Sequence, residues 1–289
     1  MTLSFSGQGY SMEASANPDM GRSFGLREEG LAGVPLLAGQ SFDQPHLALM
    51  ETGFASSLAL AAGNSSEMRF GAFAGDVETT GNDFLSGSPS MFGALAELRT
   101  DLDGGVLKAS LGTMSEEGSL LGSISEGAFG SSLRSSTFFT NLGASLAIAE
   151  DTRLTLTGAL GHSSFRQKGG IIESGRDIIT SSFGVGISRQ GLLQEEDVLS
   201  LALAQPLRVE SGRINLSVPT SRSIDGRVSY SRMSLSPRPS GREINLQASY
   251  GFNPIPAAEV SLGAMHRFDA DHVRGRRETL GLFSLSLDF

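Results

Sequence analysis

The chain has 289 residues, a net charge of −9 from 22 Lys and Arg against 31 Asp and Glu, 37 Gly, and neither Cys nor Trp. The lack of Cys excludes disulfides and thiolate metal sites, and the acidic balance without a basic run argues against a nucleic-acid partner. No stretch approaches the ~20 consecutive apolar residues of a membrane-spanning helix, whereas alternating β-strands of about 10 residues remain compatible with a membrane.

Residues 1–45 show little regular alternation, and we assign them to a linker or to the remnant of a passenger domain. Within them, residues 3–10 form a weak strand pattern, and residues 24–37 are the stretch best suited to cross the lumen of a barrel. The first eight residues lack a basic region followed by an apolar one, so no secretory signal is visible. An exported protein would then take its address from a longer chain or from a start that is missing here.

From about residue 46 to the C-terminus, segments of about ten residues alternate between apolar and small polar side chains. Phe138, Leu142 and Ile148 share one face of such a segment, while Asn141 and Ser145 lie on the other. No segment shows the i, i+3, i+4 spacing of a helix. We expect strands near residues 57–62, 68–74, 91–98, 106–114, 136–149, 153–160, 179–188, 199–204, 214–218, 228–231, 243–252, 259–268 and 283–289, and a weak one at 120–124.

The connections between these segments alternate between short and long. Residues 149–151 and 253–256 are short turns, whereas residues 163–177, 219–226, 236–241 and 269–278 are longer and richer in Pro, Gly and charge. Short turns at one end and long loops at the other are typical of membrane β-barrels. The pattern predicts an all-β fold: a closed antiparallel up-and-down transmembrane barrel of about twelve strands over residues 46–289, with a short N-terminal segment in its lumen.

The second face of the strands favours a barrel over a β-sandwich. A sandwich exposes its outer face to water and fills it with well-hydrated charges, whereas here that face is mostly Gly, Ser, Ala, Asn and Thr. Small side chains with a few opposite charges suit a barrel interior. We expect five charged residues to face the lumen: Arg153, Arg189, Glu243, Glu259 and Arg267. The small number of Tyr and Trp residues, three and none, argues against a barrel, because these aromatics usually line both membrane interfaces.

The C-terminal residues alternate strictly, with Phe283, Leu285, Leu287 and Phe289 on one face. Terminal residues are usually irregular because nothing holds them. This pattern resembles the C-terminal signature of bacterial outer-membrane β-barrels, whose last strand ends in Phe and is recognised by the barrel-assembly machinery. The resemblance implies that these four residues form an assembly signal.

The sequence contains no pattern that assigns a catalytic residue, a cofactor site or a metal site. The four histidines, His46, His162, His266 and His272, have no metal-ligand spacing, and nucleophile-elbow, phosphate-loop and zinc-protease motifs do not occur. A Ser-Gly-Arg triplet recurs at 174–176, 211–213 and 240–242, and we interpret it as a turn that begins a strand. The sequence therefore predicts that this chain is not an enzyme.

Residues 200–289 resemble a known family. The runs Ala-Leu-Ala-Gln-Pro-Leu-Arg-Val at 202–209, Gly-Arg-Ile-Asn-Leu-Ser-Val-Pro at 212–219 and Ser-Gly-Arg-Glu-Ile-Asn-Leu at 240–246, with Leu-Ser-Pro at 235–237, resemble the C-terminal region of subtilisin-like serine protease autotransporters. The resemblance implies a type V secretion barrel in the outer membrane of a Gram-negative bacterium. Its partners would be outer-membrane lipid, the barrel-assembly machinery and an N-terminal passenger domain.

The leading hypothesis is therefore an outer-membrane translocator that supports export or anchoring of a passenger, a subtilisin-like peptidase absent from this chain. Protease activity does not carry over, because the peptidase domain and its catalytic motifs are missing. Two alternatives stay open: a soluble β-rich adhesin or binding domain, and an outer-membrane pore or barrel enzyme.

Overall fold

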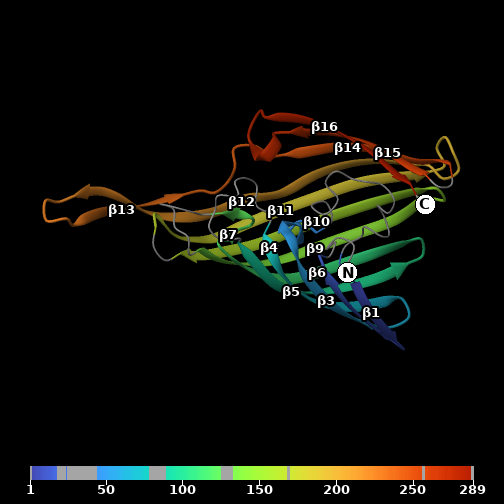
Figure 1. The fold of residues 1–289 in the computed structure, drawn as a ribbon, viewed down its shortest axis with the longest axis horizontal. Coiled ribbons are helices and arrows are strands. Elements are labelled where there is room, and N and C mark those ends of the chain that lie inside the picture. The colour runs from blue at the N-terminus through green and yellow to red at the C-terminus, as the bar shows by residue number, and fades with distance from the viewer. Residues whose placement is uncertain are drawn as a thin grey trace.

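The computed structural model describes residues 2–17, 24, 44–77, 89–124, 133–167, 170–255 and 258–287. These residues form an antiparallel sheet of fourteen strands and a separate two-stranded hairpin (Figure 1). The strands of the sheet are β1 (Thr2–Gly7), β2 (Tyr10–Ala16), β3 (Met50–Ala61), β4 (Ser66–Val77), β5 (Ser90–Leu102), β6 (Gly105–Glu117), β9 (Leu133–Ala149), β10 (Thr152–Gln167), β11 (Ile172–Gln190), β12 (Val198–Arg222), β13 (Val228–Leu235), β14 (Ile244–Ile255), β15 (Ala258–Phe268) and β16 (Arg277–Leu287). The hairpin consists of β7 (Ser119–Leu120) and β8 (Ser123–Ile124), and two short 3₁₀ helices are η1 (Leu47–Leu49) and η3 (Ala270–His272).

Thirteen of the fourteen strands follow one another across the sheet in chain order. β13 lies off this path and pairs with the end of β12, which is 25 residues long and extends past the other strands as a protruding hairpin (Figure 1). The up-and-down antiparallel arrangement confirms the all-β prediction. The sequence had divided β12 into two strands, at 199–204 and 214–218, but one strand spans both.

The predicted closed barrel of about twelve strands is wrong in two respects. Residues 2–16 supply two further strands, because Gly9, at φ 82°, allows a tight turn between them, and β2 then pairs with β3. Within the described residues β1 pairs only with β2 and β16 only with β15, so the sheet is curled but open. With six residues, β1 could cover only part of the eleven of β16.

Residues 2–16 thus belong to the sheet, although the sequence had placed them in a linker or passenger remnant. The division into a segment 1–45 and a barrel 46–289 otherwise stays a prediction. Of the proposed lumen-crossing stretch 24–37, only Phe24 lies among the described residues.

The described connections follow the predicted alternation of short turns and long loops in part, since of the four predicted long loops only 236–241 and 269–278 lie mostly outside strands. The end of the strands with short turns, here called the tight-turn rim, includes residues 62–65, 103–104, 150–151 and 191–197. The other end, the long-loop rim, includes residues 223–227, 236–243 and 269–276. The region 163–177 is mostly strand rather than loop, since β10 continues to Gln167 and β11 begins at Ile172.

The Ser-Gly-Arg triplets are not one recurring turn. Gly175 and Arg176 lie within β11, and Arg213 lies within β12, where Arg176 and Arg213 are directly paired. Only the third triplet, at 240–242, lies in a loop before β14. The turn interpretation is therefore wrong for the first two copies, whose glycine and arginine continue the strands.

Candidate functional site

The sheet exposes its apolar face and buries much of its small and polar one. Along β9, Phe138 and Leu142 are 55% and 62% exposed, whereas Asn141 and Ser145 on the same strand are buried. Exposed apolar residues also lie on other strands from β3 to β16, and buried polar residues lie on strands from β5 to β15. Exposed apolar residues include Phe54, Phe70, Phe92, Leu111, Leu160, Phe183, Leu201, Leu246, Leu262 and Phe283. Buried polar residues include Thr137, Thr155, Thr180, Ser182, Ser200, Asn245, Gln247, Ser249 and Ser261.

The exposed apolar face, called the outer wall below, has the height of a bilayer core. On β9 the outward positions run from Phe138 to Ile148, ten residues apart. At about 3.3 Å per residue they span about 33 Å along the strand, and at the ~40° tilt of membrane strands about 25 Å along the membrane normal. An apolar band of that height is what a membrane-spanning sheet presents to lipid.

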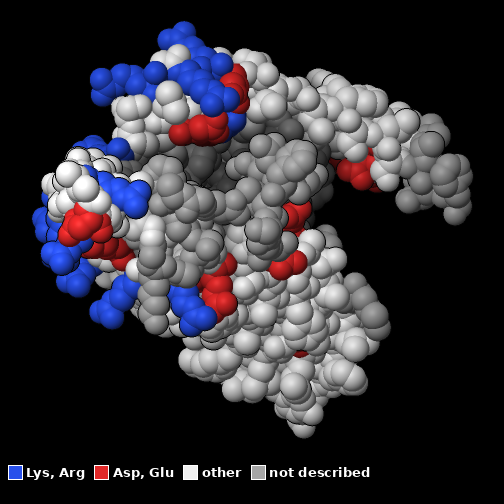
Figure 2. All heavy atoms as spheres, turned by 60° about the vertical axis from the view of Figure 1, so that its left-hand side comes forward, with Lys and Arg blue, Asp and Glu red and all other residues white. Residues whose placement is uncertain are grey.

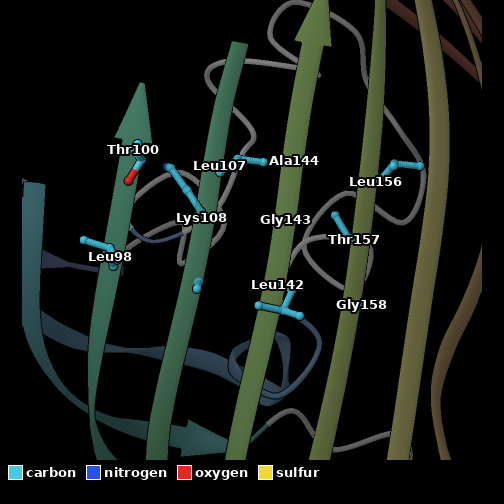
Figure 3. A pocket seen from close by; sticks show the side chains of 11 residues that line it. Leu98, Thr100, Leu107, Lys108, Leu142, Gly143, Ala144, Leu156, Thr157 and Gly158 are labelled. Atoms are coloured by element: carbon cyan, nitrogen blue, oxygen red, sulfur yellow. The ribbon is translucent and has the colours of Figure 1, made fainter. Parts of the chain in front are cut away.

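The outer wall also carries a shallow apolar groove of about 490 Å³ across β5, β6, β9 and β10 (Figure 3). Leu98, Leu107, Leu142 and Leu156 line it, together with the smaller side chains of Ala109 and Ala144 and with Gly158. Leu142 is paired with Ala109 on one side and Gly158 on the other, so it projects from the wall between two small neighbours.

Described residues from the connection between β2 and β3 lie on the concave side of the sheet. Phe24, Gln44 and Leu47 are buried there against Met91, Met114 and other residues of an interior cluster. Gln44 donates a hydrogen bond from Nε2 to the Phe24 carbonyl over 2.8 Å. A Cβ at Gly71 would overlap the Phe24 ring, so glycine is needed for this contact. Of the stretch 24–37 that was expected to cross the lumen, Phe24 lies on this side of the sheet, and the rest of that expectation stays a prediction.

Two polar contacts hold the described residues 44–46, here called the inner segment, to the wall. Asn141 on β9 donates from Nδ2 to Gln44 Oε1 over 2.6 Å and to Ser110 Oγ over 3.2 Å. His46 Nε2 lies 3.2 Å from Thr180 Oγ1 on β11, and its ring stacks on Phe139 with centroids 5.1 Å apart. Because buried polar groups need partners, these contacts orient the inner segment across the interior.

The interior near the long-loop rim contains an ion-pair network centred on Arg267. Its guanidinium donates two hydrogen bonds to the Glu243 carboxylate, at 2.8 and 3.0 Å, and others to Glu278 at 2.5 Å and Asp271 at 2.7 Å. Glu243 is 2% exposed. Arg276 also pairs with Asp271 and Glu278. The network links β15, β16 and Glu243, the residue before β14, to the loop 269–276.

Of the other three residues expected in the lumen, only Arg153 is at an interior position away from the rim. Arg153 has the interior parity of Thr155, and its Nη1 lies 3.5 Å from the Ser145 hydroxyl. Arg189 has the outward parity of Ile187 and pairs with Asp151 at the tight-turn rim, so it does not face the interior. Glu259 has the interior parity of Ser261 but is exposed at the same rim. The structure therefore brings only Glu243 and Arg267 of the five into contact.

The expected assembly signal is partly described. Phe283 and Leu285 are 66% and 53% exposed on β16, at the outward positions opposite Leu262 and Val260. Leu287 continues this register opposite Ala258, without a described side chain. Phe289 lies outside the described residues. Recognition by an assembly machinery stays a prediction.

The histidines are used in separate local contacts. His162 lies 3.6 Å from Asp177, and His266 Nδ1 lies 2.8 Å from Thr279 Oγ1. His272 accepts the Glu243 backbone N–H at Nδ1. Across the described ranges, no group of three His, Asp or Glu is arranged to hold a metal ion, and no helix is long and apolar enough to cross a membrane.

Asp197 organises the largest of the described tight turns. Its buried carboxylate accepts hydrogen bonds from the backbone N–H groups of Leu192, Leu193 and Gln194 at 2.6 to 2.9 Å, and from the Tyr250 hydroxyl at 2.7 Å. Burial opposes the charged form, but these hydrogen bonds outweigh it and lower the pKa of Asp197 to about 2.

We expect this turn to lose order in acid. Because the folded-state pKa of about 2 lies below the usual value of about 3.9, the Asp197 carboxylate stabilises the turn above about pH 4, and the effect is lost as the pH falls to about 2. Hydrogen exchange at residues 192–194 should show protection factors that fall over this window. Asp197→Asn should show low protection at every pH, and identical profiles for the two proteins would contradict the assignment.

Sequence reasoning did not find the inner segment contacts or the partners of Asp197. Gln44 and His46 lie in a stretch without alternation. Nothing in the spacing of Asn141 or Thr180 shows that these two residues contact Gln44 and His46. Among the described residues, Gly71 and Gly161 are a sequence feature consistent with these contacts, because a Cβ at either position would overlap Phe24 or His46.

No protein-family model matches the chain, and neither does a curated protein. Among solved structures, the chain is similar to the CymD monoaromatic hydrocarbon channel, with 12% identity, a TM-score of 0.34 and 82% of each chain covered. It is also similar to the siderophore receptor PirA from Acinetobacter baumannii, with 10% identity and a TM-score of 0.40. That alignment covers 99% of this chain and 54% of the receptor. At such identities and TM-scores, these similarities carry no argument about function.

Proposed function

We propose that this chain is a membrane-embedded β-sheet of the outer membrane of a Gram-negative bacterium. The observation that carries the proposal is the inverted polarity of the sheet: the outer wall exposes Phe138, Leu142, Leu160 and their counterparts, whereas Thr137, Asn141 and Ser145 are buried. Water would destabilise an apolar surface of this extent, but lipid would not. The ~25 Å height of the wall agrees with the apolar band of membrane barrels.

The distribution of charge supports the same proposal. Figure 2 shows Lys, Arg, Asp and Glu gathered toward the end that carries the long loops and β13, with few charges on the wall seen below them. Charged side chains are costly in the hydrocarbon core and are accommodated at its margins. Unpaired backbone groups are costly there too, so the proposal requires β1 and β16 to be paired in the membrane, with each other or with strands of another copy.

The finer proposal is a translocator that exports or anchors an N-terminal passenger. The resemblance of residues 200–289 to subtilisin-like autotransporters supports it. The inner segment lies between β2 and β3, so it is a part of the sheet's own interior rather than a passenger in transit. In this proposal the chain itself performs no catalysis, and its working partners are outer-membrane lipid, the barrel-assembly machinery and the passenger.

The test is expression of the full chain behind a signal peptide, with a folded reporter domain fused before Met1. We expect the fusion in the outer-membrane fraction, with different gel migration before and after boiling, and a reporter cut by protease added to intact cells. The control is the same reporter exported without the chain. A membrane-inserted chain with a protected reporter would overturn the translocator role alone. A soluble periplasmic product would overturn both proposals and favour the soluble β-rich binding domain.

A further inference from the structure

Four arginines lie on four consecutive strands close to the long-loop rim. Arg134 is on β9, Arg166 on β10, Arg176 on β11 and Arg213 on β12, and all four are exposed. We call them the arginine row. Arg134 is paired directly with Arg166 across β9 and β10, and Arg176 is paired directly with Arg213 across β11 and β12.

The arginine row points outward, away from the interior. Arg134 follows Leu133, Arg166 follows Phe165, and Arg213 precedes Ile214. Leu133, Phe165 and Ile214 pack together with Ile178 in one interior cluster. Arg176 follows Gly175, where a Cβ would overlap the interior ring of Phe165. Because successive side chains in a strand point to opposite faces, all four arginines share the face of the outer wall.

The row lies just beyond the apolar part of that wall. Arg134 is four residues from Phe138 on β9, about 13 Å along the strand and about 10 Å along the membrane normal at the tilt assumed above. Between the row and the apolar wall lie the polar residues Ser136 on β9 and Ser164, its pairing partner on β10. Long arginine side chains can reach back toward the edge of the hydrocarbon region, so the row lies at the depth of lipid headgroups.

The row carries more positive charge than its surroundings neutralise. Glu117 pairs with Arg134 at 3.1 Å, and Asp177 lies 3.6 Å from His162. The four arginines therefore lie near three described carboxylates, Glu117, Asp177 and Glu173, of which Asp177 lies near His162 and Glu173 pairs with Arg232 on β13. Like charges directly opposite each other on neighbouring strands destabilise a sheet. An anion placed between them would remove that penalty, and the guanidinium group is suited to phosphate because it can donate two parallel hydrogen bonds.

We propose that the arginine row binds the phosphate of an anionic membrane lipid, one whose headgroup carries a net negative charge. Charge complementarity identifies the phosphate, and the continuity of the row with the outer wall identifies the lipid, since an acyl chain attached to that phosphate would lie against Phe138 and Leu160. A soluble phosphate has no apolar part that could contact the outer wall. This inference rests on the proposed membrane function and adds a lipid class to it.

The test uses the absence of Trp from the chain. Phe138→Trp places a single fluorophore beside the row, and Ile148→Trp places one on the same strand near the other rim. Each full-length protein is folded into phosphatidylcholine vesicles that contain either brominated phosphatidic acid or brominated phosphatidylcholine of the same chain length. Quenching then reports which lipid lies beside each reporter. A further arm adds excess inorganic phosphate.

We expect the Phe138→Trp reporter to show a preference of about fivefold or more for phosphatidic acid, and the Ile148→Trp reporter to show little preference. Changing Arg134, Arg166, Arg176 and Arg213 to Gln should remove it. The matched control changes four exposed arginines of the protruding β12–β13 hairpin and the loop after it, Arg222, Arg227, Arg232 and Arg238, to Gln and should retain it. Arg176→Gln alone, expected to weaken the preference, provides a second variant if the fourfold change prevents folding.

A preference that survives in the row variant, or that is equal at both reporters, would overturn the proposal. Full competition by inorganic phosphate would also overturn it, by showing a free-phosphate site instead. These outcomes are distinct from failure of the membrane function: quenching by brominated phosphatidylcholine without any preference refutes only the row. Absence of quenching by either lipid refutes the membrane-embedded sheet itself.

Discussion

Replacing Leu142 by Arg is expected to destabilise the membrane-inserted chain by about 2–4 kcal/mol, or to prevent its insertion. Leu142 is 62% exposed near the centre of the outward positions of β9, and its cross-strand neighbours are Ala109 and Gly158. The substitution therefore removes little packing. Its cost comes from placing a guanidinium at the level of the bilayer core, and unfolding by denaturant from vesicles measures it.

The matched control is Leu193→Arg in the turn at the tight-turn rim. Leu193 is 77% exposed and lies outside the strands, so the same chemical change should alter stability by no more than about 0.5 kcal/mol. If the outer wall faced water, both substitutions would be equally mild. Equal effects of the two variants would therefore refute the membrane-embedded sheet and support a soluble domain.

Replacing Arg267 by Met is expected to destabilise the fold by about 2–3 kcal/mol, because it leaves the Glu243 carboxylate buried without its two charged hydrogen bonds. Glu278 and Asp271 would also lose a partner. The value is below that of a fully buried pair since the Arg267 side chain is 20% exposed. Loss of the network should also loosen the loop 269–276.

The double variant Arg267→Met with Glu243→Met isolates the cause. Removing both charges should recover part of the loss, because no unpaired buried charge remains between these positions. An exposed pair provides the comparison: Arg232 and Glu173 are 84% and 40% exposed, and Arg232→Met should cost less than about 0.5 kcal/mol. A double variant less stable than Arg267→Met would show that packing of the two side chains, rather than charge, holds the rim together.

The strand pattern was predictable from the sequence because it depends on local alternation. Phe138, Leu142 and Ile148 on one face and Asn141 and Ser145 on the other were assigned correctly, and so was the smaller, more polar character of the second face. Neighbouring segments with short and long connections gave the antiparallel order. These features follow from the two-residue period of a strand and the residue types of turns.

The errors have two causes. Arg189 was expected in the lumen, but it lies two residues after the outward Ile187, so alternation itself places it on the outer face, where it pairs with Asp151. The triplets containing Arg176 and Arg213 look like turns, yet bulges let both strands continue through them. A bulge changes which face a residue occupies without changing composition, so local alternation cannot locate it.

By itself, the sequence determined that this is a chain of alternating strands that has no thiols, no membrane-spanning helix pattern and no catalytic motif. These properties depend only on amino-acid composition and on the local spacing of apolar residues. Only the tertiary structure decided that the described residues form a sheet of fourteen strands in which β1 and β16 are not paired with each other, and that Gln44 and His46 occupy its interior. It alone decided that four distant arginines form one outward row. Such facts depend on pairing between residues far apart in the chain, which brings together side chains that no local pattern connects.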